Sequence, residues 1–422
     1  MKVEQAFLGT LLKNNYLIRD TALTPMHLES PQHRLLLKTM QDLTREGKSV
    51  DVAIVSVSVD VESIGGVSYL NDLLAMSNDK KLDDYENIIL DAWKEREKKN
   101  ILVKAQEEDW EIEKINESLE MLNQSKADDL VDIKDLMVEM YETPWEPKPL
   151  KQQGIKMGLT DFDIMTDGFQ NGELTIIAAR PSMGKTDVAL HIAKQAGWNK
   201  HLPIVFSLEM PAKSLANRLI ASIGMINRLK LRDPFNDFSD EQKKRWGTVT
   251  GRVSDTNVKM FDESIQTVSD MRAKVRKLLS DYPGMKPIIL IDYLQLITPR
   301  SHYNGNANAQ VTEISKDLKR MARDFDCPVI ALSQLSRAVE QRQDKRPMMS
   351  DIRDSGSVEQ DADLIMFLFR NSYYNKEESE GPIDTLELII AKHRNGPIGT
   401  VDTQYNKFTG VIRDANYTRP VS

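Results

Sequence analysis

The residues with the clearest chemical potential are three in a row, Gly184, Lys185 and Thr186. They follow an apolar run at residues 174–178 and precede a segment of helical character at residues 187–196. In such a strand–loop–helix setting, backbone N–H groups and the helix N-terminus surround the phosphates of a nucleotide. Lys185 is then expected to reach the β- and γ-phosphates, while the Thr186 hydroxyl is expected to contact Mg²⁺. The pattern predicts an ATP-binding P-loop.

One position departs from the usual P-loop pattern, which has a glycine where this chain has Ala179. Alanine keeps the small size, but a positive φ there would be costly. A P-loop also needs an acidic partner for the metal at the end of a neighbouring strand, and Asp292 follows four apolar residues, 288–291. The residues predicted to bind nucleotide and Mg²⁺ are Ser182, Met183, Gly184, Lys185, Thr186 and Asp292.

Hydrolysis of ATP further requires a group that activates water. Glu209 follows an apolar run, and Gln334 ends another. The carboxyl ends of parallel strands share one edge of a sheet, where ligands bind, so both side chains are expected near the γ-phosphate. Glu209 is the candidate general base, and Gln334 is the candidate sensor of the γ-phosphate. The alternative for each is an ordinary polar residue on the surface.

The elements that must position these residues follow from the hydrophobic pattern after residue 154. Short apolar runs alternate with helical segments, and near-continuous apolar runs indicate strands that are buried on both faces. We therefore expect an α/β domain with a mostly parallel sheet. The predicted strands are residues 174–179, 203–208, 258–261, 287–291, 328–332, 364–369, 386–391 and 400–405.

The first part of the chain has apolar residues at helical spacing and is predicted to be an all-α domain, residues 1–122. Residues 123–153 form a predicted linker that contains a short amphipathic helix and then three prolines. From the sequence alone, this helix could pack on its own domain or on a neighbouring subunit. Residues 154–422 form the predicted α/β domain that carries the P-loop.

Composition sets wide limits on function. The 422 residues are 40% hydrophobic and 28% charged, with a formal net charge of −8, which neither indicates nor excludes nucleic acid. The single cysteine, Cys327, precludes an intramolecular disulfide and reads as a small buried residue. Neither a signal peptide nor an apolar stretch long enough for a membrane span is evident, so a soluble, cytoplasmic protein is expected.

Beyond these local patterns, the chain resembles the DnaB-type replicative hexameric helicases over its whole length. The N-terminal part carries EQAFLG (4–9) and GGVSYL (65–70), with Tyr85 and Arg96 as later landmarks. The C-terminal part carries AARPSMGKT (178–186), FSLEM (206–210), IDYLQ (291–295), ALSQLSR (331–337), KRP (345–347), SDIRDSGSVEQDAD (350–363) and AKHRNGP (391–397).

The resemblance implies a RecA-like motor domain in a ring whose ATP sites lie between subunits. Arg394 then matches the family's arginine finger and Lys392 its companion, although by themselves they read as an exposed basic pair. Arg353, Asp354 and Gly356 match a loop that contacts single-stranded DNA in the central channel, with Asp354 where many relatives have Glu. The resemblance also favours docking of the linker helix on the adjacent subunit.

The function that the resemblance implies is ATP-dependent 5′–3′ translocation on single-stranded DNA and unwinding of forked duplex by a homo-hexamer, with a primase and a helicase loader as partners. Two alternatives stay open. One is a RecA-type recombinase, which would form filaments and would not need the helical N-terminal domain. The other is a helicase paralogue that only loads or inhibits a true helicase, against which the retained Lys185, Glu209, Asp292 and Arg394 argue.

Overall fold

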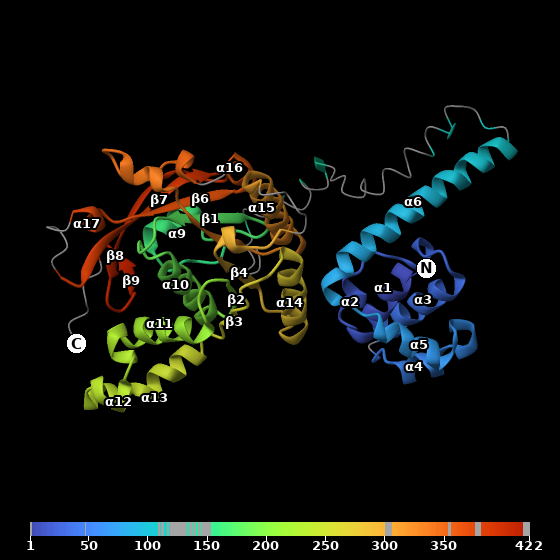
Figure 1. Ribbon diagram of the computed structural model, residues 1–422, viewed down its shortest axis with the longest axis horizontal. Coiled ribbons are helices and arrows are strands. Elements are labelled where there is room, and N and C mark those ends of the chain that lie inside the picture. Colours follow the sequence, from blue (N-terminus) through green and yellow to red (C-terminus); the bar gives the residue numbers. More distant parts are fainter. Residues whose placement is uncertain are drawn as a thin grey trace. The chain divides into compact units, whose positions relative to one another are not determined.

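The computed structural model describes residues 2–46, 48–108, 153–299, 306–352, 356–375 and 381–416, with isolated positions between 110 and 145. The chain divides into two compact units (Figure 1). One comprises Met1–Pro147 with Arg276–Asp281, and the other comprises Lys148–Val275 with Tyr282–Ser422. The linker bounds at residues 123 and 153 stay a prediction.

Every regular element described in the N-terminal unit is a helix, so the predicted all-α class is confirmed. The apolar stripes of α1 and α3 meet in one core, where Phe7, Leu11, Leu36 and Met40 are completely buried. The α-helices are α1 (Lys2–Lys13), α2 (Leu17–Asp20), α3 (Pro31–Arg45), α4 (Val52–Ser58), α5 (Gly66–Ala75) and α6 (Leu82–Glu107).

The predicted linker helix lies almost wholly outside the described residues. Of its apolar stripe, Ile133 and Met137 are described, and their side chains are 64% and 51% exposed. Tyr141 and Trp145 continue the spacing of four and are also exposed. Docking of this helix on an adjacent subunit therefore stays a prediction.

A nine-stranded sheet forms the centre of the C-terminal unit, in the order β3-β2-β4-β5-β1-β6-β7-β8-β9. The pairs from β3 through β6 are parallel, and the pairs from β6 through β9 are antiparallel. This confirms the predicted α/β class with a mostly parallel sheet. The parallel strands are β1 (Leu174–Ala179), β2 (Leu202–Ser207), β3 (Lys259–Phe261), β4 (Pro287–Asp292), β5 (Val329–Gln334) and β6 (Leu364–Phe369).

The antiparallel edge of the sheet differs from the sequence-based prediction. The apolar runs at 386–391 and 400–405 were expected to be buried on both faces, but burial alternates along β7 (Ile383–His393) and β8 (Gly399–Asn406). That part of the prediction is wrong, because an antiparallel strand can expose one face. Strand β9 (Ile412–Asp414) was not predicted.

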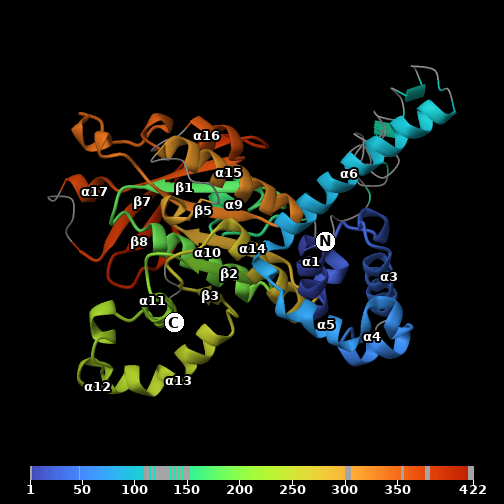
Figure 2. The ribbon, with the colours of Figure 1, turned by 45° about the vertical axis from the view of Figure 1, so that its right-hand side comes forward.

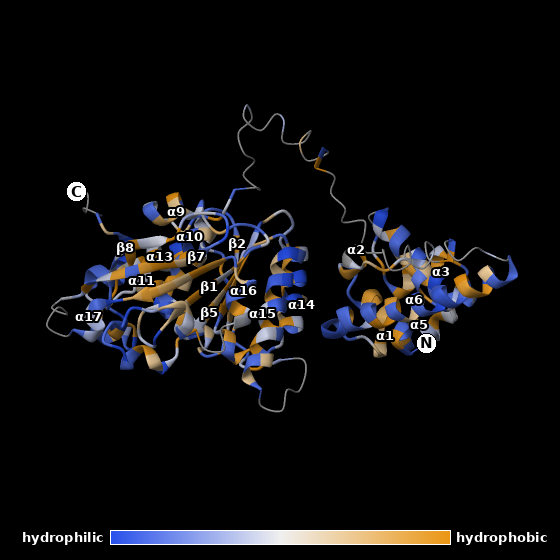
Figure 3. Cartoon of the chain, turned by 90° about the horizontal axis from the view of Figure 1, so that it is seen from above, coloured by the Kyte–Doolittle hydropathy of each residue, from blue (hydrophilic) through white to orange (hydrophobic). Residues whose placement is uncertain are grey.

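Helices cover both faces of this sheet, as Figures 1 and 2 show. Helix α10 packs on β1, β2, β4 and β5, while α15 packs on β1 and β5 from the other side. In Figure 3 the strands between them carry the hydrophobic colour. The α-helices described after residue 153 are α9 (Thr160–Thr166), α10 (Lys185–Trp198), α11 (Ala212–Gly224), α12 (Pro234–Asp237), α13 (Asp240–Ser254), α14 (Val268–Asp281), α15 (Ala307–Asp324), α16 (Gly356–Asp361) and α17 (Asn371–Tyr374).

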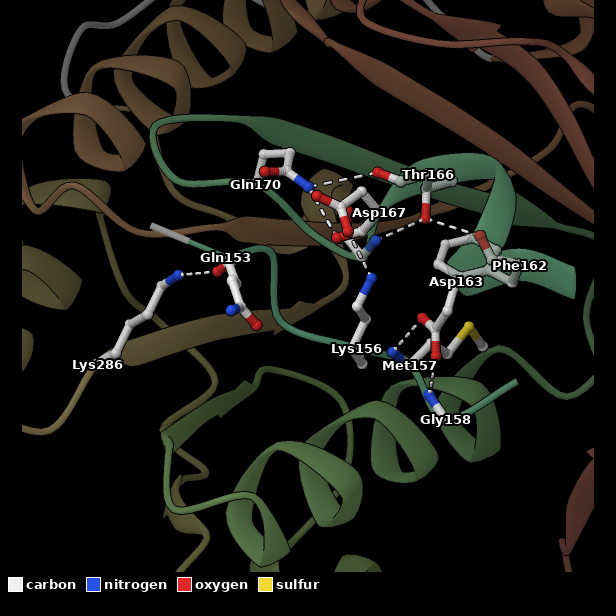
Figure 4. A network of polar contacts seen from close by, with 11 residues as sticks. Gln153, Lys156, Met157, Gly158, Phe162, Asp163, Thr166, Asp167, Gln170 and Lys286 are labelled. Carbon is white, nitrogen blue, oxygen red and sulfur yellow. Dashed lines mark hydrogen bonds and ion pairs between the residues drawn. The ribbon is translucent and has the colours of Figure 1, made fainter. Parts of the chain in front are cut away.

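A polar network closes the segment that leads into β1 (Figure 4). The Asp163 carboxylate accepts hydrogen bonds of 2.8 Å from the backbone N–H groups of Met157 and Gly158. Burial raises the pKa of Asp163, and the two N–H donors oppose that shift. Nearby in α9, Thr166 Oγ1 donates to Phe162 O at 2.9 Å. These hydrogen bonds fix the segment of residues 157–166, which precedes the strand that carries the P-loop.

Candidate active site

The loop between β1 and α10 has the backbone geometry of a phosphate cradle. Two of its residues have positive φ, Ser182 at 64° and Gly184 at 104°. Ala179 is instead the last residue of β1, paired in register with Gln334 on β5. The substitution of alanine for glycine therefore costs nothing at this position, because the chain is extended there and makes its left-handed turns further on.

Two loop residues have side chains that serve the fold. The Met183 side chain is 1% exposed and belongs to the core, so only its backbone can face a phosphate. Arg180 is buried, and its guanidinium bonds Glu340 at 2.9 Å and Leu335 O at 2.8 Å. Ser182 is exposed, and Gly184 caps the N-terminus of α10. The loop is thereby braced against the segment that follows β5.

The two predicted metal ligands lie side by side. Thr186 Oγ1 donates a 2.8 Å hydrogen bond to Asp292 Oδ2, and Asp292 is the last residue of β4. Burial raises the pKa of Asp292, whereas the Thr186 hydroxyl and the charge of Lys185 lower it. A hydroxyl and a carboxylate are hard oxygen donors that suit Mg²⁺, which in nucleotide sites takes its other ligands from phosphates and water. The donor set fits the metal that the P-loop implies.

Lys185 lies at the same end of the strands as Thr186 and Asp292. Its Nζ donates to Ser333 O at 3.0 Å and lies 5.5 Å from the centre of the Tyr293 ring. Burial lowers the Lys185 pKa to about 8, and the charges of Asp292 and Glu209 partly offset that shift. The ammonium group is therefore poorly solvated and would gain from an anionic ligand.

Glu209 and Gln334 occupy the same edge of the sheet. Glu209 lies two residues beyond the end of β2 and is exposed, and its charge acts on both Lys185 and Asp292. Gln334 ends β5, and its backbone N–H donates to Gln295 Oε1 at 3.4 Å. The structure thus brings Glu209 and Gln334 together with the phosphate loop. Their catalytic roles stay predictions.

The predicted finger pair, Lys392 and Arg394, lies at the opposite end of the parallel strands, where they begin. We call this end the amino edge of the sheet and the end that carries the P-loop the carboxyl edge. Lys392 Nζ donates to the carbonyls of Glu359 and Ala362, the latter at 2.7 Å. Arg394 donates to Gln360 O and, at 3.3 Å, to Asp363 Oδ1. Burial and the neighbouring Arg394 charge lower the Lys392 pKa.

The strand register shows how far apart the two groups are. Arg394 N donates to Asp363 O, and Asp363 N donates to Leu174 O, both at 2.9 Å. Leu174 begins β1, whereas Ala179 ends it at the P-loop. Five residue steps along a strand span about 16 Å, which exceeds the reach of an arginine side chain. Arg394 and Lys185 of one chain therefore cannot act on the same phosphate.

The predicted DNA loop lies mostly outside the described residues. Arg353 and Asp354 are not described, and Gly356 is the first residue of α16. Contact between this loop and DNA stays a prediction.

A cluster behind the P-loop was not predicted from the sequence. Asp187 is buried and accepts hydrogen bonds from Arg218 at 3.0 Å and from the Tyr405 hydroxyl at 2.6 Å. Arg228 Nη2 forms an ion pair with the same carboxylate at 2.7 Å. The Arg370 guanidinium lies 5.1 Å from the centre of the Tyr405 ring. Asp187 and Tyr405 are 218 positions apart, so no local pattern could link them. The one available signal was an acidic residue directly after Thr186.

Cys327 is buried, and burial raises its thiol pKa to about 12, in keeping with the small buried residue that was predicted. Among the described residues, none of the helices is both long enough and apolar enough to cross a membrane.

The fold and this site define the class of protein, a P-loop NTPase with a RecA-like parallel sheet. Residues 154–413 match the model of the DnaB-like helicase C terminal domain, and residues 1–91 match the DnaB-like helicase N terminal domain. The chain therefore belongs to the DnaB-like helicase family. This confirms the sequence-based identification of an ATP-dependent DNA helicase of the replicative type.

Individual relatives agree over nearly the full length. The chain is 37% identical to the replicative DNA helicase DnaB of Geobacillus stearothermophilus and also 37% identical to the replicative DNA helicase DnaC of Bacillus subtilis, in each case over 98% of this chain and 95% of the relative. A solved structure described as a DnaB-like replicative helicase and its interactions with primase is 38% identical, with a TM-score of 0.64, over 98% of this chain and all of that one. A second solved structure, described as an ATPase domain, is 43% identical, also with a TM-score of 0.64, over 68% of this chain and all of that one.

Proposed function

We propose that this chain forms a homo-hexameric ring that couples ATP hydrolysis to 5′–3′ translocation on single-stranded DNA and so separates a forked duplex. The observation that carries the proposal is the division of the site between two edges of one sheet. Lys185, Thr186 and Asp292 lie at the carboxyl edge, while Arg394 lies at the amino edge. A ring of copies in head-to-tail contact would join the two halves at every interface.

At the carboxyl edge, backbone N–H groups of the P-loop and the start of α10 would bind the phosphates. Lys185 would leave Ser333 O for the β- and γ-phosphates, and Thr186 and Asp292 would hold Mg²⁺ directly or through water. When bound, Mg²⁺ neutralises charge on the phosphate oxygens. Glu209 would orient water and accept its proton, and Gln334 would sense the γ-phosphate through a hydrogen bond.

The amino edge of the next subunit would supply the cations. Arg394 would stabilise the charge that develops on the transferring phosphoryl group, and Lys392 would assist it. Loss of that charge after hydrolysis would weaken the interface. The loop that contains Arg353, Asp354 and Gly356 would then change its grip on the DNA backbone, a contact independent of sequence and sensitive to salt.

Partners follow from the family. One related structure is described as a DnaB-like replicative helicase and its interactions with primase, so we extend a primase contact to this chain. A helicase loader is proposed on the family resemblance alone. The linker helix, with the exposed side chains of Ile133 and Met137, would dock on the adjacent motor domain.

A forked-duplex unwinding assay with ATP and Mg²⁺ tests the function directly. We expect strand separation by the wild-type chain and none by Lys185→Ala, while Lys316→Ala, which changes an exposed lysine on α15, behaves as wild type. DNA-stimulated ATPase activity without strand separation would instead favour a loading or inhibiting paralogue. Filaments in place of closed rings in electron micrographs would favour a recombinase.

A further inference from the structure

Asp363 is a buried carboxylate with several partners at the amino edge of the sheet. It lies between α16 and β6, and its residue is 4% exposed. One oxygen accepts from Leu174 N at 2.8 Å and from Lys319 Nζ at 2.5 Å. The other oxygen lies 3.3 Å from Arg394 Nη1. The carboxylate therefore joins the first residue of the P-loop strand, helix α15 and the predicted finger.

Three backbone carbonyls complete the surroundings of the finger pair. Helix α16 ends at Asp361, and the last carbonyls of a helix lack partners within the helix and attract cations. Here Lys392 bonds the carbonyls of Glu359 and Ala362, and Arg394 bonds that of Gln360. We call the Asp363 carboxylate with these three carbonyls the finger cradle.

We propose that the finger cradle positions Arg394 and Lys392 for a neighbouring subunit's nucleotide, with Asp363 as the positioning residue. This inference rests on the proposed function, because it assigns a task to Asp363 only if Arg394 acts as a finger. Asp363 itself would touch neither nucleotide nor Mg²⁺.

The exposure of the three charged groups supports positioning. The Asp363 and Lys319 side chains are 6% and 14% exposed, whereas the Arg394 side chain is 46% exposed. The cradle thus holds the guanidinium through Nη1 and Nη2 while nearly half of the side chain faces outward. A long flexible cation held in this way loses less conformational freedom when it meets a phosphate.

Asp363 pairs with a second cation, Lys319, so Arg394 is free to donate hydrogen bonds to a phosphate. Lys319 approaches Asp363 more closely than Arg394 does, at 2.5 Å against 3.3 Å. Lys319 therefore provides the main neutralising charge for the buried carboxylate. Arg394 can turn toward a phosphate without leaving Asp363 as an unpaired buried charge.

The finger cradle lies at the C-terminal end of the helix whose first residue is a predicted DNA contact. Helix α16 begins at Gly356, a predicted DNA-binding residue, and its last carbonyls contact the finger pair. The six residues of α16 thus connect the predicted DNA contact to the end of the helix that holds the cations.

A double-mutant cycle on DNA-stimulated ATPase activity tests the proposal, with Asp363→Asn, Arg394→Ala and the two combined. Asparagine keeps an oxygen for Leu174 N but removes the charge beside Arg394. We expect Asp363→Asn to lower kcat about tenfold and to leave the KM for ATP within about twofold. In the Arg394→Ala background, the same change should lower kcat by no more than about twofold, because the group it positions is already absent.

Two further variants separate positioning from general damage. Asp363→Glu keeps the charge that pairs with Lys319, so it should fold even if Asp363→Asn does not, with a smaller kcat loss of about threefold that also disappears in the Arg394→Ala background. Asp324→Asn removes another ion pair, 2.7 Å from Arg272, at the end of α15, and should leave kcat near that of the wild type. Thermal unfolding and ring assembly are followed for each variant.

The outcomes are distinct. If Arg394→Ala has normal activity, the proposed finger itself is wrong. If Arg394→Ala is impaired but the effects of Asp363→Asn and Asp363→Glu multiply with it, the finger stands and the positioning role of Asp363 is overturned. A raised KM for ATP in both Asp363 variants with kcat unchanged would also overturn it, since that result would place the effect on the P-loop strand.

Discussion

The two edges of the central sheet hold their charged groups in different ways. At the carboxyl edge, Thr186 and Asp292 bond each other directly, and Asp292 is only 5% exposed. At the amino edge, Arg394 rests on a carbonyl and a carboxylate, with its side chain 46% exposed. The first edge is organised within one chain, whereas the second presents its cation outward. In one chain the predicted finger and the P-loop are thus too far apart to act on one phosphate, so the proposed ATP site would need two chains.

The largest expected effect comes from removing the cation of the amino edge. Arg394→Ala should lower the kcat of DNA-stimulated ATP hydrolysis by about 10³-fold, because an arginine finger stabilises charge only in the transition state. Binding of ATP should change little, since the P-loop is intact. Steady-state kinetics with a nucleotide-binding assay checks both, and Arg320→Ala, a 67% exposed arginine side chain on α15, is the control. A loss of ATP affinity as large as the loss of kcat would mean that Arg394 already binds ATP in the ground state, which contradicts a role confined to the transition state.

The second-largest effect is expected at the carboxyl edge, from a change of the candidate general base, Glu209. Glu209→Gln should lower kcat by about 10²-fold while the ring still binds ATP, because the amide can orient water but cannot accept its proton. Single-turnover hydrolysis with labelled ATP measures this step. Glu241→Gln, at an exposed position on α13, should be unaffected. Normal hydrolysis by Glu209→Gln would mean that another group activates water.

The pH dependence of ATP binding tests the charge of Lys185 at the carboxyl edge. Because burial lowers the Lys185 pKa to about 8, the free chain loses this charge as pH rises above 8. Above that point ATP binding must take up a proton, so the Kd for ATP should rise by up to about tenfold per pH unit. Below about pH 7 the lysine is charged and the Kd should be flat. Titration calorimetry from about pH 6.5 to about pH 9.5 spans the Lys185 pKa and measures this.

A matched variant isolates the lysine in that experiment. Lys185→Arg keeps a charge at every pH tested, so its binding should be weaker but independent of pH above about 8. If the wild-type Kd instead stays constant to the top of the pH range, Lys185 keeps its charge throughout and burial does not lower its pKa to about 8.

The smallest expected effect concerns the position that departs from the P-loop pattern. Ala179 is an extended strand residue, so Ala179→Gly gains no useful backbone freedom and should cost roughly 0.5–1 kcal/mol of unfolding free energy. ATPase activity should stay within about twofold of the wild type. Denaturant unfolding and steady-state kinetics measure the two effects. A marked gain in activity would mean that a glycine is needed there after all.

Local patterns in the sequence located most of the carboxyl edge. Apolar runs predicted the parallel strands, and each candidate there lies at or just after the end of a strand, so Asp292, Glu209 and Gln334 could be found from their neighbours alone. The Asp187–Tyr405 contact could not, because it depends on how an antiparallel strand packs against α10. Such long-range pairs follow from the completed fold, and no spacing encodes them.

The amino edge shows the same limit more strongly. Without the family resemblance, Lys392 and Arg394 read as an exposed basic pair at the end of a strand. Their surroundings come from α16, the start of β6 and α15, which are brought together only by the crossover connections of the sheet. The half-exposed β7 and β8 were misjudged for a related reason, since apolar content alone does not tell an antiparallel edge from a buried strand.

Complementation between two inactive chains tests the shared site most directly. Arg394→Ala chains keep an intact P-loop, and Lys185→Ala chains keep an intact finger. The measurement is single-turnover ATP hydrolysis by rings assembled from both, beside rings of Arg394→Ala mixed with the Lys185→Ala/Arg394→Ala double variant, which brings no finger. Our account predicts hydrolysis only in the first mixture. No hydrolysis at any mixing ratio, in rings that mass spectrometry shows to be mixed, would contradict it.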